Sequence, residues 1–182
     1  MKKYWVWLSS LEKVSPISRL KLLNYFKDPR NIWNASENEL RKLQLLTENA
    51  INQLINPKYK TEVLKHLKAI DKERIELITI EDKEYPYYLK NIYDPPVVLY
   101  VKGKLIQHEK SISIVGSRKA TSYGLEAGEE LAYQLSMLGT TITSGMARGI
   151  DSSAHKGALR AKGRTIAVLG CGHDIVYPPE NR

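Results

Sequence analysis

The placement of glycine constrains the fold of this chain more than any other feature of its sequence. All 11 glycines lie at Gly103 or later, so the first 102 of the 182 residues contain none. Glycine lets the backbone turn tightly and approach other groups closely, because it has no side chain. We therefore expect two regions of different architecture, with tight loops confined to the second.

The first region has the pattern of short helices. Serine and threonine cap helices, and proline fits the first helical position, so these residues mark helix starts. The expected starts are Ser15-Pro16, Ser36 with Glu39 at capping-box spacing, Thr47 and Pro57. Apolar residues recur at helical spacing after these starts and predict a small helical core. The core candidates are Leu20, Leu23, Phe26, Leu40, Leu43, Leu46, Val63, Leu64 and Leu67.

Two DNA-binding interpretations of this helical region are less favoured than simple packing. A helix-hairpin-helix turn brings backbone N–H groups close to phosphate and normally needs glycine, which this region lacks. Aromatic side chains can stack on bases, but we expect them to pack in the core. These aromatic residues are Tyr4, Trp5, Trp7 and Trp33.

The second region alternates strands with helices. Residues 76–80 and 97–101 have the pattern of strands joined by a connecting segment, and three β-branched runs follow at residues 112–115, 140–143 and 165–169. Helix-patterned segments separate these three runs, which predicts right-handed βαβ units and a parallel sheet. The expected fold class is therefore α/β, with a helical domain over residues 1–75 and a Rossmann-like parallel-sheet domain over residues 76–182.

Each of the three β-branched runs ends in a glycine-containing loop. Ligands of open parallel sheets bind outside the carboxyl ends of the strands, where following helix starts offer unpaired N–H groups. Serine hydroxyls and arginine forks suit phosphate oxygens. The third loop is Gly170-Cys171-Gly172-His173, and the first two provide the candidate phosphate-binding residues. These are Gly116, Ser117, Arg118, Lys119, Ser144, Gly145, Met146, Ala147, Arg148 and Gly149.

The type of phosphate follows from what accompanies these loops. The dinucleotide pattern G-x-G-x-x-G does not follow the first run, and the P-loop pattern G-x-x-x-x-G-K-[ST] is missing. Arg118, Lys119 and Arg148 instead favour a chain of phosphates, as in a nucleic-acid backbone. Such contacts are sensitive to salt and largely indifferent to base sequence.

The titratable residues do not form a convincing catalytic centre. Asp151 and His155 can share a helix face, but we expect Asp151 to cap a helix and His155 to be a hydrogen-bonded, half-buried residue. Cys171 has His173 two residues away, yet an inert thiol in a small-residue turn is favoured. The histidines and the cysteine lack metal-ligand spacing, so we expect no metal, no cofactor and no enzymatic activity.

Composition narrows the setting of the protein. No apolar run is long enough to cross a membrane, and the single cysteine fits a reducing cytoplasm. The formal net charge of +8 makes polyanions plausible partners.

Several segments together resemble the DprA family, also called Smf, the DNA-processing proteins of natural transformation. The segments are "YPYYLKNIYDPPVVLYVKGK", "SIVGSRKATSYG", "TSGMARGIDSSAHKGAL" and "GRTIAVLGCGHDIVYPPENR". The resemblance implies a small sterile-alpha-motif-like or helix-hairpin-helix-like domain followed by an extended Rossmann fold. It also implies that the protein binds and protects single-stranded DNA, helps to load RecA recombinase, and self-associates when full-length.

The same resemblance assigns DNA contacts to particular residues. The family's Gly-Ser-Arg loop corresponds to Gly116, Ser117 and Arg118, and its Ser-Gly-x-Ala loop to residues 144–147. Asn181 fits the pattern near the end of the chain. Pro179 stands where some members have a DNA-contacting lysine, and Arg182 is a candidate to supply that charge. Family members continue beyond this point, so the chain is expected to be a fragment with a truncated sheet.

Two other functions remain open at this stage. The same Rossmann variant resembles nucleotide phosphoribohydrolases, although their Pro-Gly-Gly-x-Gly-Thr loop does not occur in this sequence. A protein-interaction scaffold, in which the helical region docks a partner, is the other alternative.

Overall fold

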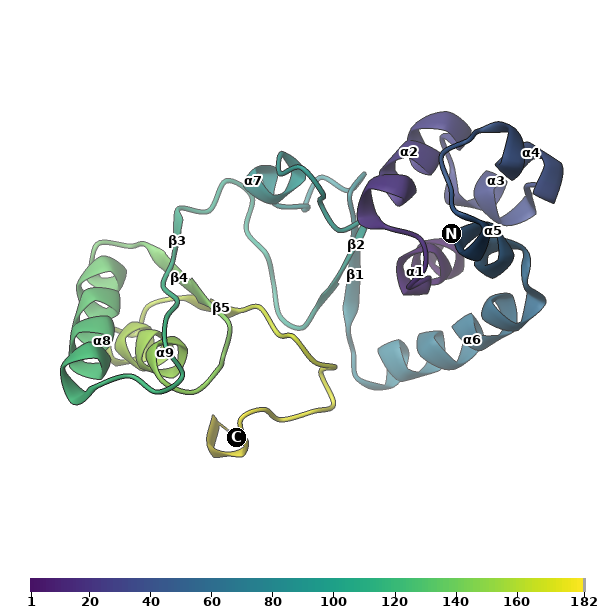
Figure 1. Ribbon diagram of the computed structural model, residues 1–182. Helices are drawn as coiled ribbons and strands as arrows, with labels where there is room; N and C mark the ends of the chain where they lie inside the picture. The colour runs from purple at the N-terminus through teal and green to yellow at the C-terminus, as the bar shows by residue number, and fades with distance from the viewer. Residues whose placement is uncertain (182) are drawn as a thin grey trace. The chain divides into compact units, whose positions relative to one another are not determined.

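The computed structural model describes residues 1–181 and divides into two compact units, Met1–Gln107 and a second that begins at His108 (Figure 1). The first unit opens with six helices, which are α1 (Lys2–Ser10), α2 (Pro16–Phe26), α3 (Pro29–Asn34), α4 (Glu37–Lys42), α5 (Glu48–Ile55) and α6 (Pro57–Lys72). Among the described residues, no helix combines the length and apolarity that a bilayer crossing requires.

The predicted helix starts are confirmed. The Ser15 side chain accepts a hydrogen bond from the Ser18 N–H and caps α2, and the Thr47 side chain caps α5 in the same way. Ser36 and Glu39 form the reciprocal capping box of α4. These starts were predictable because each cap is made within a few residues of its own sequence.

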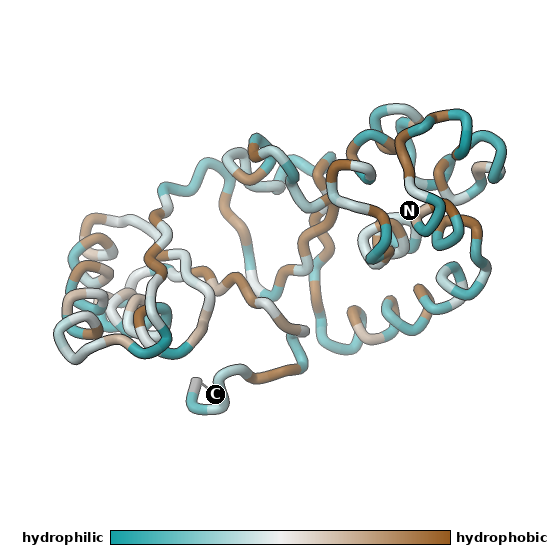
Figure 2. The backbone as a smooth tube through the Cα atoms, viewed as in Figure 1, coloured by the Kyte–Doolittle hydropathy of each residue, from teal (hydrophilic) through white to brown (hydrophobic). Residues whose placement is uncertain are grey.

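The helices enclose an apolar core around Trp7, Leu8 and Leu11, each with no exposed surface. Along α6 hydrophobic and hydrophilic residues alternate, as expected for a helix with one buried face (Figure 2). Leu64 was expected in this core, but its side chain is 54% exposed, because it lies on the outer face of α6. Trp5 is buried as predicted, whereas Tyr4 and Trp33 are only partly buried.

A β-hairpin completes the first unit. Strands β1 (Glu76–Thr79) and β2 (Val98–Val101) pair antiparallel, with the short helix α7 (Tyr87–Lys90) between them. Val97 and Val98 belong to the same apolar core as the helices, and the unit therefore extends to Gln107. The six consecutive helices α1 to α6 end at residue 72, close to the domain boundary after residue 75 that the sequence suggests, and that boundary stays a prediction.

The second unit is the predicted parallel sheet with helices. Strands β3 (Ser111–Ser113), β4 (Thr141–Ser144) and β5 (Thr165–Ala167) lie side by side in chain order, with Ile112 opposite Ile142 and Thr143 opposite Ile166. Helix α8 (Ser122–Met137) connects β3 to β4, and α9 (Ile150–Arg160) connects β4 to β5 (Figure 1). A 3₁₀ turn, η1 (Pro179–Asn181), follows β5.

Small residues bring α8 and α9 into close contact. Ala132, Ala154 and Ala158 have no exposed surface. A side chain added to Gly157 would place its Cβ 2.1 Å from the Glu129 carbonyl oxygen, so only glycine fits there.

A group of polar side chains joins the amino-terminal ends of the three strands. The Glu109 carboxylate, just before β3, accepts a hydrogen bond of 2.5 Å from the Thr141 hydroxyl at the start of β4. The same carboxylate pairs with the Arg164 guanidinium, which directly precedes β5. One side chain therefore ties together the beginnings of all three strands.

Candidate nucleic-acid interface

The loops that follow β3 and β4 are locked together. Because the two strands are parallel neighbours, their carboxyl ends meet at one edge of the sheet. The Ile150 N–H, at the start of α9, donates to the Ser117 carbonyl oxygen over 3.2 Å. Gly149 has φ of +81°, and a Cβ there would lie 2.1 Å from the same oxygen. A Cβ on Gly116 would lie 2.7 Å from Ile150 Cγ1, so glycine is required on both sides of the contact.

The loop after β3 presents two cations to solvent. Arg118 and Lys119 are both exposed, and neither makes an ion pair with any residue in the described range 1–181. The Ser117 hydroxyl oxygen accepts a hydrogen bond of 3.1 Å from the Lys119 N–H, which closes a small turn within the loop. This loop therefore holds two positive side chains on a backbone that is fixed by the turn at Ser117 and by the hydrogen bond from Ile150.

Some of the helix-start N–H groups that the sequence suggested as phosphate donors are already used within the protein. The Ile150 N–H is used by Ser117, and the Gly124 N–H of α8 donates to the Thr121 hydroxyl over 3.2 Å. Asp151 was expected to cap α9, but Gly149 occupies the cap position.

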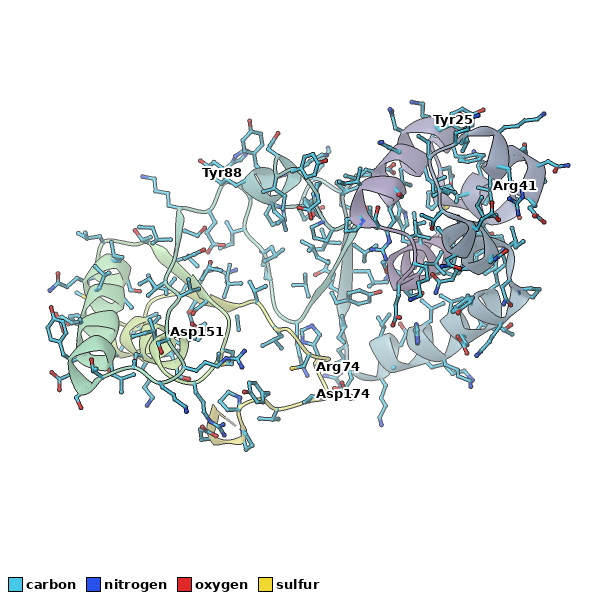
Figure 3. The ribbon with its side chains drawn as sticks, in the orientation of Figure 1. Tyr25, Arg41, Arg74, Tyr88, Asp151 and Asp174 are labelled. Atoms are coloured by element: carbon cyan, nitrogen blue, oxygen red, sulfur yellow. The ribbon has the colours of Figure 1, made fainter. Side chains whose placement is uncertain are left out.

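Asp151 is instead a buried carboxylate in the first turn of α9. Its Oδ2 accepts a hydrogen bond of 3.4 Å from the Ala147 N–H and would lie 2.7 Å from a Cβ on Gly145 (Asp151 is labelled in Figure 3). A carboxylate there already compensates the positive end of the helix dipole. Asp151 therefore reduces the attraction that the start of α9 would exert on an anion.

Ser144 serves the sheet in this conformation. Its side chain is only 2% exposed, and its hydroxyl donates to the Ile114 carbonyl oxygen over 2.6 Å. A hydroxyl has a single proton to donate, so that proton is not available to a phosphate. The expectation that Ser144 donates to a ligand is therefore not supported by the hydrogen bonds of this structure.

Arg148 has a partner that the sequence did not reveal. Its Nε donates to Glu180 Oε1 over 2.6 Å and its Nη2 to Oε2 over 3.4 Å. The pair raises the pKa of Arg148 and lowers the pKa of Glu180, in both cases mainly through the side-chain hydrogen bond. Glu180 lies in η1, as does the backbone of Asn181, whereas Arg182 lies outside the described residues. Met146 completes this loop with a left-handed φ of 59°.

The possible catalytic residues are engaged in structural contacts. The Thr165 hydroxyl donates to the Ile142 carbonyl, so its contact of 2.7 Å with His155 requires the Nδ1 atom of the imidazole to donate. His155 is buried, more deeply than the half-burial expected, and burial lowers its pKa while Asp151 opposes the shift. The Cys171 thiol approaches the Ile175 carbonyl at 3.6 Å. No group of metal-ligating side chains occurs within residues 1–181.

The fold and the paired loops define a class of protein, an α/β protein with two exposed cations on a loop at the carboxyl edge of a parallel sheet. The family model for DNA recombination-mediator protein A matches residues 76–182, more than half of the chain. The chain therefore belongs to the DNA recombination-mediator protein A family, as the resemblance of its motifs indicated.

Known relatives are consistent with this membership. Protein Smf from Synechocystis sp. is 34% identical over 98% of this chain, which covers 46% of that protein. DNA processing protein DprA from Bacillus subtilis is 43% identical over 63% of this chain, which covers 39% of that protein. The chain thus spans about half the length of the curated relatives it matches, or less.

A solved structure shows the same fold. The X-ray structure of DNA processing protein A from Streptococcus pneumoniae aligns with all of this chain at a TM-score of 0.65 and 30% identity, and the chain covers 62% of that structure. The similarity includes the helical region as well as the parallel sheet.

Proposed function

We propose that this chain is the DNA-binding part of a recombination mediator that holds single-stranded DNA by its phosphates. In this proposal the protein protects incoming DNA in the cytoplasm and helps to load RecA recombinase on it during natural transformation. Membership in a recombination-mediator family supports the role in DNA recombination. The RecA partner and the self-association of the full-length protein enter the proposal from the resemblance of the sequence motifs.

The observation that carries the proposal is the pair of exposed cations on a fixed loop. Arg118 and Lys119 have no carboxylate partner among residues 1–181, and the loop that holds them is pinned by the Ile150–Ser117 hydrogen bond. A guanidinium can grip a phosphate with two parallel hydrogen bonds, and pre-positioned cations lose less entropy on binding. Phosphate contacts leave the bases accessible, as loading a recombinase requires.

We infer that the activity is binding and not catalysis. Asp151 and His155, the most plausible acid and base in this region, are buried and hydrogen-bonded to the protein itself. The other proposed members of the site are Gly116, Ser117, Gly145, Met146, Ala147, Arg148, Gly149, Asn181 and Arg182.

Fluorescence anisotropy of a labelled oligothymidine strand tests this function. Arg118→Ala should weaken binding by about 1–3 kcal/mol and lower the salt slope by about 0.7, the value for one phosphate on a single strand. Lys156→Ala is the matched control, because Lys156 is an exposed cation of the same unit on α9, outside the loops. Equal effects of the two substitutions on affinity and salt slope would contradict the assignment of the loop.

A further inference from the structure

A second group of cations gathers around aromatic rings in the helical unit. Tyr4 and Trp33 pack edge-to-face with ring centroids 5.3 Å apart, and Trp7 packs on Trp33 at 5.1 Å. The Lys3 ammonium lies 4.8 Å from the centroid of Tyr4, and the Arg30 guanidinium lies 5.6 Å from the same ring. The rings come from α1 and α3, so the cluster is held by two packed helices.

Lys60 of α6 fixes the position of this cluster. Its ammonium donates to the Trp33 carbonyl oxygen over 2.6 Å and lies 5.3 Å from the Trp33 ring centroid. A cation at the end of α3 also complements the negative end of that helix. Lys60 is partly buried, whereas Lys3 and Arg30 are exposed.

The cations of this cluster form no ion pairs within residues 1–181, although the Asp28 carboxylate accepts a hydrogen bond of 2.6 Å from the backbone N–H of Arg30. Within the described part of the chain, none of the ion pairs involves Lys3, Arg30 or Lys60. Ring faces orient a cation but carry no full negative charge, so Lys3 and Arg30 keep their charge for an anionic ligand.

The overall charge distribution points the same way. Residues 1–107 carry 19 lysines and arginines against 13 aspartates and glutamates, whereas residues 108–182 carry 9 against 7. Most of the excess positive charge therefore lies in the helical unit and not in the unit with the glycine loops.

We propose that Lys3 and Arg30, held on the Tyr4–Trp33 pair, form a second contact for the phosphate backbone of nucleic acid. Cations that leave the ring faces for phosphates uncover aromatic surface on which an unpaired base can stack. The partly exposed rings of Tyr4 and Trp33 thus make single strands the favoured ligand over duplexes, whose bases are already stacked. The proposal does not depend on the function of the glycine loops.

Tryptophan fluorescence can observe this contact separately. All three tryptophans, Trp5, Trp7 and Trp33, lie in the helical unit, and residues 108–182 contain none. Unlabelled oligothymidine should therefore change the tryptophan emission of the chain with the same apparent affinity as it changes anisotropy. The change should persist in the double variant Arg118→Ala with Lys119→Ala.

Charge reversal supplies the second measurement. Lys3→Glu with Arg30→Glu should weaken oligothymidine binding roughly tenfold at low salt and lower the salt slope by about 1.4, the value for two single-strand phosphates. Lys21→Glu with Lys90→Glu makes the same change of charge on α2 and α7, which contribute no residue to the cluster, and should cost much less. Lys3→Arg with Arg30→Lys keeps both charges and should retain binding, and thermal unfolding of each variant identifies any loss of folding.

The outcomes separate this contact from the proposed function of the loops. Loss of binding in the Lys3/Arg30 reversal but not in the Arg118/Lys119 variant supports the helical contact and contradicts the loop assignment. Equal effects of the Lys3/Arg30 and Lys21/Lys90 reversals would overturn the proposed DNA contact in the helical unit. Binding of oligothymidine without any change in tryptophan emission would overturn it as well. If the unsubstituted protein binds no oligothymidine, both proposed contacts are overturned. Equal affinity for a duplex and for a single strand would overturn the role of base stacking.

Discussion

The loop after β3 and the loop after β4 both combine glycine, serine and arginine, yet the structure uses the two sets of side chains in opposite ways. In the first loop, Ser117 and Arg118 are exposed, and Arg118 makes no ion pair within residues 1–181. In the second, Ser144 is buried and donates a hydrogen bond to the Ile114 carbonyl oxygen, and Arg148 is paired with Glu180. The residue types are alike, but their neighbours are not.

This difference teaches that one loop presents charge while the other supports it. At the end of the loop after β4, Gly149 leaves room for the Ser117 carbonyl oxygen, and the Ile150 N–H donates to that oxygen. The buried Asp151 accepts a hydrogen bond from the Ala147 N–H and so fixes the loop after β4 itself. We therefore expect substitutions in the loop after β4 to change the free energy of unfolding, and substitutions in the loop after β3 to change the affinity for single-stranded DNA.

Gly149→Ala should have the largest effect. A Cβ there meets the Ser117 carbonyl oxygen at 2.1 Å, and φ is +81°. The clash and the backbone strain together should lower the free energy of unfolding by about 3 kcal/mol or more. Gly139→Ala is the matched control, since Gly139 has φ of +78° but nothing within 4 Å of its Cβ among the described atoms. That control should cost only about 1 kcal/mol in urea denaturation, and equal costs would break the comparison.

Ser144→Ala should have an intermediate effect. It removes the buried hydrogen bond to the Ile114 carbonyl and should lower the free energy of unfolding by about 1–2 kcal/mol. The affinity of the folded protein for single-stranded DNA should not change. Ser117→Ala should do the reverse, with a stability change within about 0.5 kcal/mol and weaker binding, because Ser117 is exposed. Denaturation and anisotropy on both variants would reveal any exchange of these roles.

Glu180→Gln should sharpen the contrast between the two arginines. It removes the carboxylate that holds Arg148 and should strengthen oligothymidine binding by about 0.5–1 kcal/mol, as expected for an exposed ion pair that competes with phosphate. Glu126→Gln makes the same charge change at an exposed position of α8 and should have a smaller effect on anisotropy. Weaker binding after Glu180→Gln would mean that the carboxylate positions Arg148 for the strand.

The pH dependence of stability should show the smallest effect. Burial lowers the pKa of His155 below its ordinary value of 6.5. The unfolded chain therefore binds a proton more readily than the folded chain, and the free energy of unfolding should fall as pH drops through 6.5 toward the folded pKa. His155→Gln should flatten this part of the profile in urea denaturation, and an unchanged slope would show that other groups produce it.

The sequence predicted the parts of the fold that depend on local residues. The caps at Ser15, Ser36 and Thr47 and the alternation of strands and helices need only nearby sequence, and the structure confirms them. The cap position of α9 was missed because Gly149 is placed by its contact with Ser117, a residue far away in the sequence. Leu64 was misplaced because a helix with broad apolar spacing leaves some leucines on its outer face.

The candidate site was predictable as a location but not as a set of contacts. Glycine loops at strand ends mark the edge of a parallel sheet, and the structure brings the loops after β3 and β4 together there. The pairing of Arg148 with Glu180 joins residues 32 positions apart, and no spacing rule anticipates it. The burial of Ser144 likewise follows from the register of β3 and β4.

The junction at Glu109 has a mechanical consequence. Glu109 is the second residue of the sheet unit, and its carboxylate joins the beginnings of β3, β4 and β5. A pull on the chain from the helical unit would reach this junction before it reached the rest of β3. The force would be shared among three parallel strands, so we expect little of it to reach the glycine loops at their far ends. Tension on the connecting chain would then leave the geometry of the proposed phosphate site unchanged.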